Sequence, residues 1–373
     1  MRVLTALLFF CLVYTSVYSQ ADNPYSYYMR TSANYGYIMQ HRNSMGHLIK
    51  GHIYGGEIDY VLPTKGDEVW HYENNFPEKG IAFSYYNLGN PEQLGSLYAI
   101  APFYEIPLKA RKSPSRLYLR LSSGLAYATK RFDPIANHKN NVISVNFNAF
   151  VNFKWFYQFD ITNRLRLEAG LNFSHASNGK YKAPNLGINM LTLNSGLIYK
   201  FRSKKEIAPV ICSDSSSCAP SRHEIYALAA IGFNEVEPPG GAKYAAETYT
   251  LGYYYNRRNT HKFGGGLDLY YLGAVAEEIY REDSVRYSNP ARYIQVGAKF
   301  SYCYNVGRTV FPVEFGYYLK TPYLGDGLFF HRIGVRHYLK NNIILNFSLK
   351  THWAVASFFE FGAGYRIPLK KKK

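Results

Sequence analysis

Apolar and polar residues alternate along most of the chain with a period of two, which is typical of strands that have one apolar face. Between Leu165 and Phe173, for example, apolar residues occupy nearly every second position, with Arg166, Glu168 and Asn172 between them. Alternating segments of this kind recur at 47–62, 95–107, 115–129, 143–158, 164–176, 188–202, 223–235, 246–257, 261–273, 292–305, 308–319, 327–338, 341–352 and 355–367. The pattern predicts an all-β protein of about 14 strands, with a range of about 12–16.

The connections between these segments differ in length at the two ends of the predicted strands. Those at one end are short and fall at 161–164, 258–260, 306–307 and 340–341. Those at the other end are mostly longer and fall at 63–94, 130–142, 177–187, 236–245 and 274–291. This asymmetry is typical of bacterial barrels with short periplasmic turns and long external loops. The segment 202–221 is an exception, because it is long and polar although it falls at the short-turn end.

Composition indicates which solvent the apolar faces meet. Aromatic residues make up 17% of the chain, with 37 Tyr and 24 Phe. Residues 1–19 have an early Arg2 and a short apolar stretch, so they are expected to form a secretory signal peptide. No long apolar helix pattern follows, and a chain can then span a bilayer as a closed barrel. We therefore expect one transmembrane antiparallel β-barrel over residues 20–373, in the outer membrane of a bacterial cell.

The net charge and the cysteines give weaker indications of binding partners and of disulfide bonds. The formal net charge of +17 favours contact with anionic lipopolysaccharide phosphates, whereas a nucleic-acid partner would require access to the cytosol. Cys212 and Cys218 could close a small disulfide loop in an oxidising compartment, or remain free thiols, because spacing alone does not establish bonding geometry. Cys303 falls on a predicted strand and is expected to be structural.

The candidate chemistry lies in the run His-Ala-Ser-Asn-Gly at 175–179. His175 and Ser177 continue the apolar row of their strand, and Asn189 begins the apolar row of the next strand. Residues two apart on a strand leave the same face, so a hydrogen bond from the serine hydroxyl to the imidazole is within reach. His175 can then accept the Ser177 proton, and Asn189 can orient the imidazole.

Attack on an ester carbonyl develops an oxyanion, which requires hydrogen-bond donors held in place. Asn178, Gly179 and Asn185 can supply backbone or side-chain N–H groups close to Ser177. The alternative is that this segment only forms a good external loop, with His175 and Ser177 ending a strand. That alternative gives no reason for three polar residues to continue lipid-facing rows. Histidines are otherwise scattered and glycine runs precede no helix pattern, so no cofactor and no metal are expected.

The spacing His175-x-Ser177-Asn178, with Asn185 eight positions after the serine, resembles the signature of the outer-membrane lipid A 3-O-deacylases of the PagL type, also grouped as acyloxyacyl hydrolase-like. The resemblance covers about residues 95–203 and is most specific over 175–189. It implies a small barrel whose His-Ser-Glu triad opens to the outer leaflet and removes an ester-linked acyl chain from lipid A. By this resemblance His175 is the base and Ser177 the nucleophile.

Two features depart from the family. Asn189 stands where the acidic triad member is expected, and an amide can orient an imidazole but cannot stabilise imidazolium by charge. Glu168 and Asp160 point to the opposite face of their strands, so neither replaces it easily. The strands after residue 203 also exceed the eight of a small barrel, and a wider barrel could enclose a polar lumen.

The sequence thus predicts an outer-membrane serine esterase acting on lipid A of lipopolysaccharide. Basic residues on the outer loops near the motif could hold the lipid A phosphates, although solvated lysines are common on loops; they are Arg131, Lys139, Lys180 and Lys182. The alternative is a non-enzymatic barrel, a channel or an assembly partner, that retains a decayed site. A channel should depend on inward residues, of which the predicted ones are Asn146, Asn148, Asn152 and Lys154. The sequence specifies neither the acyl position cleaved nor the oligomeric state.

Overall fold

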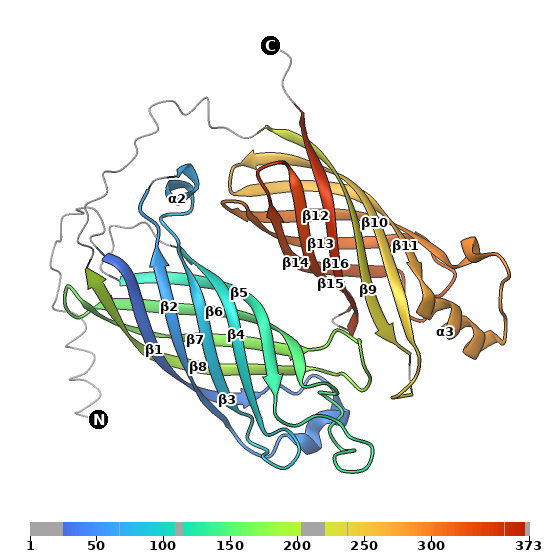
Figure 1. Ribbon diagram of the computed structural model, residues 1–373, viewed down its shortest axis with the longest axis horizontal. Helices are drawn as coiled ribbons and strands as arrows, with labels where there is room; N and C mark the ends of the chain where they lie inside the picture. Colours follow the sequence, from blue (N-terminus) through green and yellow to red (C-terminus); the bar gives the residue numbers. More distant parts are fainter. Residues whose placement is uncertain are drawn as a thin grey trace.

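Sixteen antiparallel strands form two closed eight-stranded barrels in the computed structural model (Figure 1). The structure describes residues 25–66, 68–108, 115–202, 221–236, 238–353 and 355–369. The first barrel consists of β1 (Tyr25–Ile38), β2 (Ile53–Pro63), β3 (Glu78–Asn87), β4 (Ser96–Pro107), β5 (Ser115–Ala128), β6 (Phe147–Asp160), β7 (Leu165–Ser177) and β8 (Ile188–Arg202). The second consists of β9 (His223–Glu235), β10 (Lys243–Arg258), β11 (His261–Leu272), β12 (Ile294–Val306), β13 (Thr309–Lys320), β14 (Phe329–Tyr338), β15 (Ile343–His352) and β16 (Val355–Leu369).

Each barrel closes by pairing its first strand with its last. In the first barrel β1 pairs with β8, and Ser32 lies opposite Gly196. In the second barrel β9 pairs with β16, and Ala230 lies opposite Gly362. All other pairs join strands that are consecutive in sequence, so every described strand has two neighbours and none of them forms an unpaired edge.

The alternation in the sequence becomes the two faces of each barrel wall. On β6, Phe156 and Gln158 are buried inside the barrel, whereas Trp155 and Tyr157 are exposed on its outer surface. An outer surface of aromatic and aliphatic side chains suits lipid, and an interior of polar ones is typical of transmembrane barrels. The prediction of a transmembrane antiparallel β-barrel architecture is therefore confirmed.

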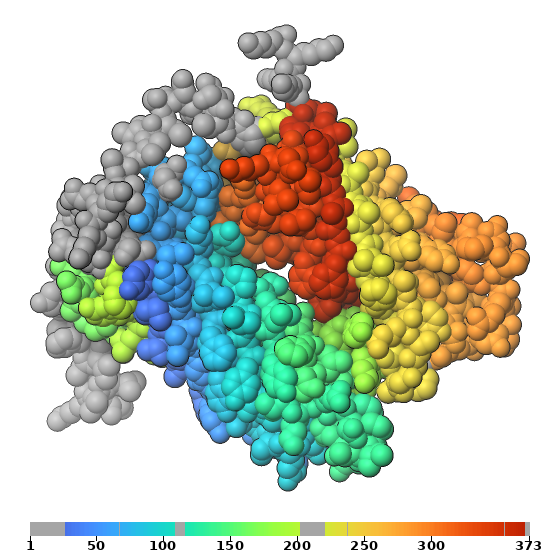
Figure 2. All heavy atoms as spheres, in the orientation of Figure 1, coloured from blue at the N-terminus to red at the C-terminus, as the bar shows by residue number. Residues whose placement is uncertain are grey.

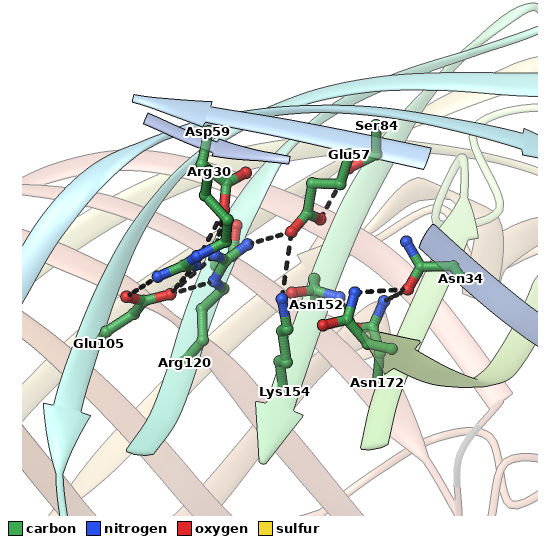
Figure 3. Close-up of polar contacts among 12 residues, drawn as sticks. Arg30, Asn34, Glu57, Asp59, Ser84, Glu105, Arg120, Asn152, Lys154 and Asn172 are labelled. Carbon is green, nitrogen blue, oxygen red and sulfur yellow. Dashed lines mark hydrogen bonds and ion pairs between the residues drawn. The ribbon is translucent and has the colours of Figure 1, made fainter. Parts of the chain in front are cut away.

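The barrel interiors are filled by paired charges and amides. Figure 3 shows this network in the first barrel, where Arg30 Nη1 lies 2.6 Å from Glu105 Oε1 and Arg120 Nη1 lies 2.8 Å from Glu57 Oε1. Lys154 Nζ lies 2.6 Å from Glu168 Oε1 in the same cluster. Buried charges are costly unless they are paired in this way. The paired side chains fill the interior of the eight-stranded barrel, whereas a wider barrel would have room for an open lumen.

The second barrel is filled by the same device. Arg332 and Lys299 both pair with Asp268, each at 3.0 Å, and Arg336 pairs with Glu314 at 2.9 Å. These groups are buried, so both described interiors are packed with side chains.

The sixteen described strands lie within the expected range of about 12–16, but they form two barrels and not the single barrel that we expected for residues 20–373. Strands β1 and β3 were missed. In β1 the outward row is interrupted by Thr31 and Ala33, and in β3 the outward row contains only three apolar residues, Ile81, Phe83 and Tyr85. Alternation also predicts strands but not their partners, because a strand has the same local pattern whichever strand closes its barrel.

The loop assignments are partly corrected as well. The expected external loop 63–94 is split by β3, and its first half, with α2 (Val69–Glu73), lies at the short-turn end. The unusual segment 202–221 falls between β8 and β9, where the chain passes from one barrel to the other. The expected signal peptide and the Cys212–Cys218 pair lie outside the described residues, and Cys303 is a buried free thiol on β12.

The two barrels lie side by side with a hollow between them (Figure 2). At the short-turn end, Tyr104 Oη and Thr309 Oγ1 are 3.2 Å apart, and Tyr304 donates to Asn74 at 2.7 Å. At the loop end, the loop after β7 contacts the second barrel, which also carries α3 (Gly273–Asp283) there. Among the described residues, no helix is long and apolar enough to cross a membrane.

Candidate active site

The His-Ser motif lies where β7 ends, at the loop end of the first barrel. His175 is paired directly with Asn189 of β8 across the strand register. Ala176 and Ser174 are buried inward, so His175 follows Leu171 and Phe173 on the outer, lipid-facing row. The structure thus places His175, Ser177 and Asn189 together on the outward row, where His175 and Asn189 are partly exposed and Ser177 is buried.

These three side chains form a hydrogen-bond chain. His175 Nδ1 lies 2.6 Å from Asn189 Oδ1, and His175 Nε2 lies 2.9 Å from Ser177 Oγ. An amide oxygen can only accept, so Nδ1 carries the proton and the lone pair of Nε2 faces the serine. Ser177 then donates to Nε2, which is the arrangement a general base requires.

Asn178 braces the loop that follows the serine. Its side-chain Nδ2 donates to Ser144 Oγ at 2.8 Å and to the Lys182 carbonyl at 3.0 Å. Its Oδ1 accepts from the Lys182 N–H at 3.3 Å. The amide group of Asn178 is therefore occupied in holding the loop, and Ser144 is a supporting residue that the sequence did not indicate.

Asn185 has a free donor beside the nucleophile. Its Oδ1 accepts from the backbone N–H of Asn178 at 3.1 Å, which fixes the amide orientation. Its Nδ2 is buried and has no hydrogen-bond partner among the described residues. A buried amide N–H group without a partner is costly, and a substrate oxygen would satisfy it.

Two glycines of this loop adopt left-handed backbone conformations and make close contacts. Gly187 has φ 75°, and a Cβ there would lie 2.8 Å from His175 Cε1. Gly179 has φ 62°, and a Cβ there would lie 2.3 Å from Phe359 Cδ2 of the second barrel. Glycine is required at both places because a side chain would displace the imidazole or the barrel contact.

The four basic loop residues are not gathered into one cluster. Arg131 and Lys139 are exposed on the loop before β6, whereas Lys180 lies 3.7 Å from Glu278 of α3. Hydrogen bonds from the Ala136 and Ile135 N–H groups lower the pKa of Asp133, and the charges of Arg131 and Lys182 act in the same direction. Arg131 and Lys182 therefore share one neighbourhood around Asp133.

No carboxylate among the described residues replaces the missing acid. Glu168 is turned into the barrel, where it pairs with Lys154 and with Arg30. Asp160 lies at the opposite end of the barrel, beside Arg166. The next group in the chain is instead His41, whose Nδ1 lies 3.2 Å from Asn189 Nδ2. No pattern in the sequence indicated His41, because β1, which precedes it, was not predicted.

The described residues contain no cluster of three or more His, Cys, Asp or Glu side chains that could hold a metal ion. The fold and the site define a membrane β-barrel with a Ser-His-Asn hydrogen-bond chain at the loop end of its outward row.

Comparison with protein families agrees with this class. Residues 54–197 match the family described as lipid A 3-O-deacylase (PagL), and residues 223–371 match the acyloxyacyl hydrolase C-terminal domain. Together the two matches cover most of the chain, and the chain belongs to this family. The first match extends beyond the expected region 95–203 and covers most of the first barrel, and the second match covers the second barrel. The strands after residue 203, which exceed the eight of a small barrel, therefore correspond to a second domain of the same family.

Among solved structures, Neisserial surface protein A is similar at 15% identity, with a TM-score of 0.33, over 49% of this chain and 100% of that one. A triple variant of the Rhodopseudomonas blastica porin is similar at 8% identity, with a TM-score of 0.18, over 92% of this chain and 99% of that one. A comparison with curated proteins gives no match. The family assignment rests on the two sequence matches, which indicate a hydrolase of the outer membrane that acts on lipid A.

Proposed function

We propose that this chain removes an ester-linked acyl chain from lipid A of lipopolysaccharide, with Ser177 as nucleophile and His175 as general base. The observation that carries the proposal is the Ser177–His175–Asn189 hydrogen-bond chain on the outer row of β7 and β8. A membrane lipid can reach this row without leaving the bilayer. Residues 1–19 would direct the chain for export to the bacterial outer membrane.

In the proposed reaction, the Ser177 hydroxyl attacks the ester carbonyl while its proton passes to His175 Nε2. The tetrahedral intermediate then collapses, and His175 returns the proton to the sugar oxygen that leaves. Water hydrolyses the acyl-serine by the same two steps, with His175 again as base and then acid. The reaction yields a free fatty acid and a lipid A with one hydroxyl restored.

Asn185 is the best placed side chain to stabilise the oxyanion, because its buried Nδ2 lacks a partner among the described residues and its Oδ1 is anchored on the residue after Ser177. One such donor contributes about 10²–10³ in kcat. Gly179 can add a backbone N–H, whereas the side-chain amide of Asn178 supports the loop.

Asn189 supplies orientation without charge. In a Ser-His-Asp enzyme, replacing the Asp by Asn costs about 10⁴ in kcat because the imidazole takes the wrong tautomer. Here the Asn189 oxygen faces Nδ1, so the tautomer is the productive one. We therefore infer a working but slower site than one with a carboxylate.

Phosphate recognition is the second part of the proposal. Arg131, Lys139 and Lys182 lie on the loops around the motif and can contact the lipid A phosphates. Lys180 is partly committed to Glu278, so its contribution is smaller. A channel function is not favoured by any observation, since Asn152 and Lys154 are buried in the filled interior.

The test is mass spectrometry of lipid A after incubation with purified, folded protein in detergent. Wild type should remove one acyl chain, and Ser177→Ala should lower the rate by about 10³-fold or more. Ser195→Ala, an exposed outward serine of β8, is the matched control and should retain full activity. Loss of no acyl chain from any of several lipid A types by folded wild type would contradict the proposal.

A further inference from the structure

The hydrogen-bond chain of the site continues one residue beyond the triad, to His41. We propose that His41 is a positioning residue, which holds the Asn189 amide in the one orientation that allows His175 to act as a base. This inference rests on the proposed function and deepens it. It assigns a role to a residue that lies outside the sequence motif.

Donors and acceptors run in one direction along the chain. His41 Nε2 lies 3.0 Å from the Leu186 carbonyl, which can only accept, so Nε2 carries the proton. Nδ1 of His41 is then an acceptor for Asn189 Nδ2 at 3.2 Å. The competing Met39 carbonyl is 3.4 Å from the same Nδ1, a longer contact that would need the opposite tautomer. The consistent order is Ser177 to His175 to Asn189 to His41 to the Leu186 carbonyl.

An asparagine needs this fourth group where an acid does not. Rotating the amide by half a turn exchanges Oδ1 and Nδ2, and Nδ2 would then face His175 Nδ1. His175 would have to place its proton on Nε2, where it could no longer accept the Ser177 proton. A carboxylate presents an oxygen in both orientations. An acceptor on the Nδ2 side of Asn189 therefore keeps the Asn189 oxygen facing His175. A carboxylate needs no such acceptor, because both of its terminal atoms are oxygens.

The fold holds the chain in place on both sides of His41, by a backbone hydrogen bond before it and by buried side chains after it. Met39 N–H donates to the Asn189 carbonyl at 2.8 Å, which continues the β1–β8 pairing to two residues before His41. The same loop buries Met45 and Leu48 in the core at this end of the barrel. His41 itself is exposed and its side-chain hydrogen bonds are confined to the site and its own loop, so its substitution should leave the barrel intact.

The experiment is a double-mutant cycle between His41 and Asn189, measured in two ways. The first readout is kcat and KM for lipid A deacylation. The second is the rate at which a fluorophosphonate labels Ser177, which reports the activated serine whatever the natural substrate is. His52 is an exposed histidine that lies, like His41, between β1 and β2. His52→Phe is therefore the control and should leave both rates unchanged.

We expect His41→Phe to lower kcat and the labelling rate by about 10–100-fold, while KM stays within about twofold of the wild-type value. The loss should be smaller than the cost of about 10⁴ for an enzyme whose histidine is held in the wrong tautomer. His41→Gln, which keeps an acceptor oxygen, should recover most of the loss. In an Asn189→Asp background, His41→Phe should change either rate by less than about threefold, because a carboxylate needs no orientation.

Equal losses from His41→Phe in the wild-type and Asn189→Asp backgrounds would show a merely structural role and overturn the inference. No loss in either background would also overturn it, as would a folded wild type that is not labelled. Labelling of Ser177 by a protein that leaves lipid A intact would instead refute the proposed substrate, while the cycle on labelling rates would still decide the role of His41.

Discussion

At the residue scale, the site depends on the placement of two ring nitrogens and two amide oxygens. His175 has Ser177 on one nitrogen and Asn189 on the other, and Asn185 Oδ1 fixes the residue after the nucleophile. Because the Asn189 oxygen can only accept, His175 Nδ1 carries the proton, and this neighbour sets the tautomer of His175. A small displacement of the imidazole would lengthen its hydrogen bonds to Ser177 and Asn189.

Gly187 sets the space available to that imidazole. Gly187→Ala would place a Cβ 2.8 Å from His175 Cε1 and strain a backbone at φ 75°. We expect kcat to fall by about 10²-fold, the effect of displacing a reacting group by about an ångström. Gly240→Ala is the matched control, since Gly240 has φ 89° and no atom within 4 Å of the added Cβ. A comparable loss in both variants of the folded protein would mean that strain alone, not the imidazole contact, is responsible.

The sequence predicted these residues to the extent that strand periodicity could. His175, Ser177 and Asn189 were placed on one outer surface because residues two apart on a strand share a face. The roles of Ser144 and His41 were not predictable, because both come from loops distant in sequence. Pairing of β6 with β7 brings Ser144 to the motif, and the closing pair of β1 with β8 brings His41 there. Periodicity describes one element at a time and carries no information on such contacts.

At the scale of elements, the site is a strand end, a ten-residue loop and the start of the next strand. Loop 178–187 is tied to the loop before β6 by the Asn178 and Ser144 pair and by the Gly187 N–H, which donates to the Val142 carbonyl at 3.0 Å. The loop is therefore a braced element on a rigid barrel, which is how sites are usually held in position.

Removing the brace should affect catalysis more than folding. Asn178→Ala deletes three side-chain hydrogen bonds, to Ser144 and to Lys182, each contributing about 1 kcal/mol. We expect kcat to fall by about tenfold or more while the heat-induced unfolding of the barrel stays nearly unchanged. The check is deacylation rate together with a gel-mobility melting curve. Unfolding of the barrel at a much lower temperature would assign Asn178 to barrel stability instead.

Element prediction from sequence succeeded for most strands and failed for two. Strands such as β6 and β8 have long apolar outward rows, whereas the outward row of β1 is interrupted by Thr31 and Ala33 and that of β3 is short. The short turns were located correctly because each lies between two strands that both have clear apolar alternation. The loop 63–94 was misassigned for the same reason that β3 was missed, since a lost strand merges the connections on both sides.

At the scale of the whole molecule, the question is what the second barrel adds. Its interior is filled by its own ion pairs, and it contacts the first barrel at both ends. At the site end, Phe359 lies beside Gly179 and the Glu235 N–H donates to the Lys180 carbonyl at 2.9 Å. The second barrel therefore packs against the loop that carries the candidate oxyanion donors.

Loosening that contact should reduce activity without touching the reacting groups. Phe359→Ala removes the ring that packs on Gly179, and we expect kcat to fall about three- to tenfold as the loop gains freedom. Phe361→Ala, the next outward residue of β16 and largely exposed, is the control and should have little effect. Equal rates for both variants would show that the second barrel does not support the site.

Closure into two barrels was the feature that the sequence could not supply. The closing pairs β1–β8 and β9–β16 join strands that are more than a hundred residues apart, and their registers leave no local mark. The family matches divide the chain at the same place, between residues 197 and 223. The number of alternating segments had favoured one wider barrel.

The central claim is that Ser177, at the end of the outward row of β7, cleaves an ester of lipid A. It is tested most directly by the initial rate of fatty acid release from lipid A in vesicles, with wild type and Ser177→Ala reconstituted side by side. The account predicts release by wild type that matches the mass lost from lipid A, and a loss of about 10³-fold or more with Ser177→Ala. Equal release by the two proteins, or none from a folded wild type, would contradict it.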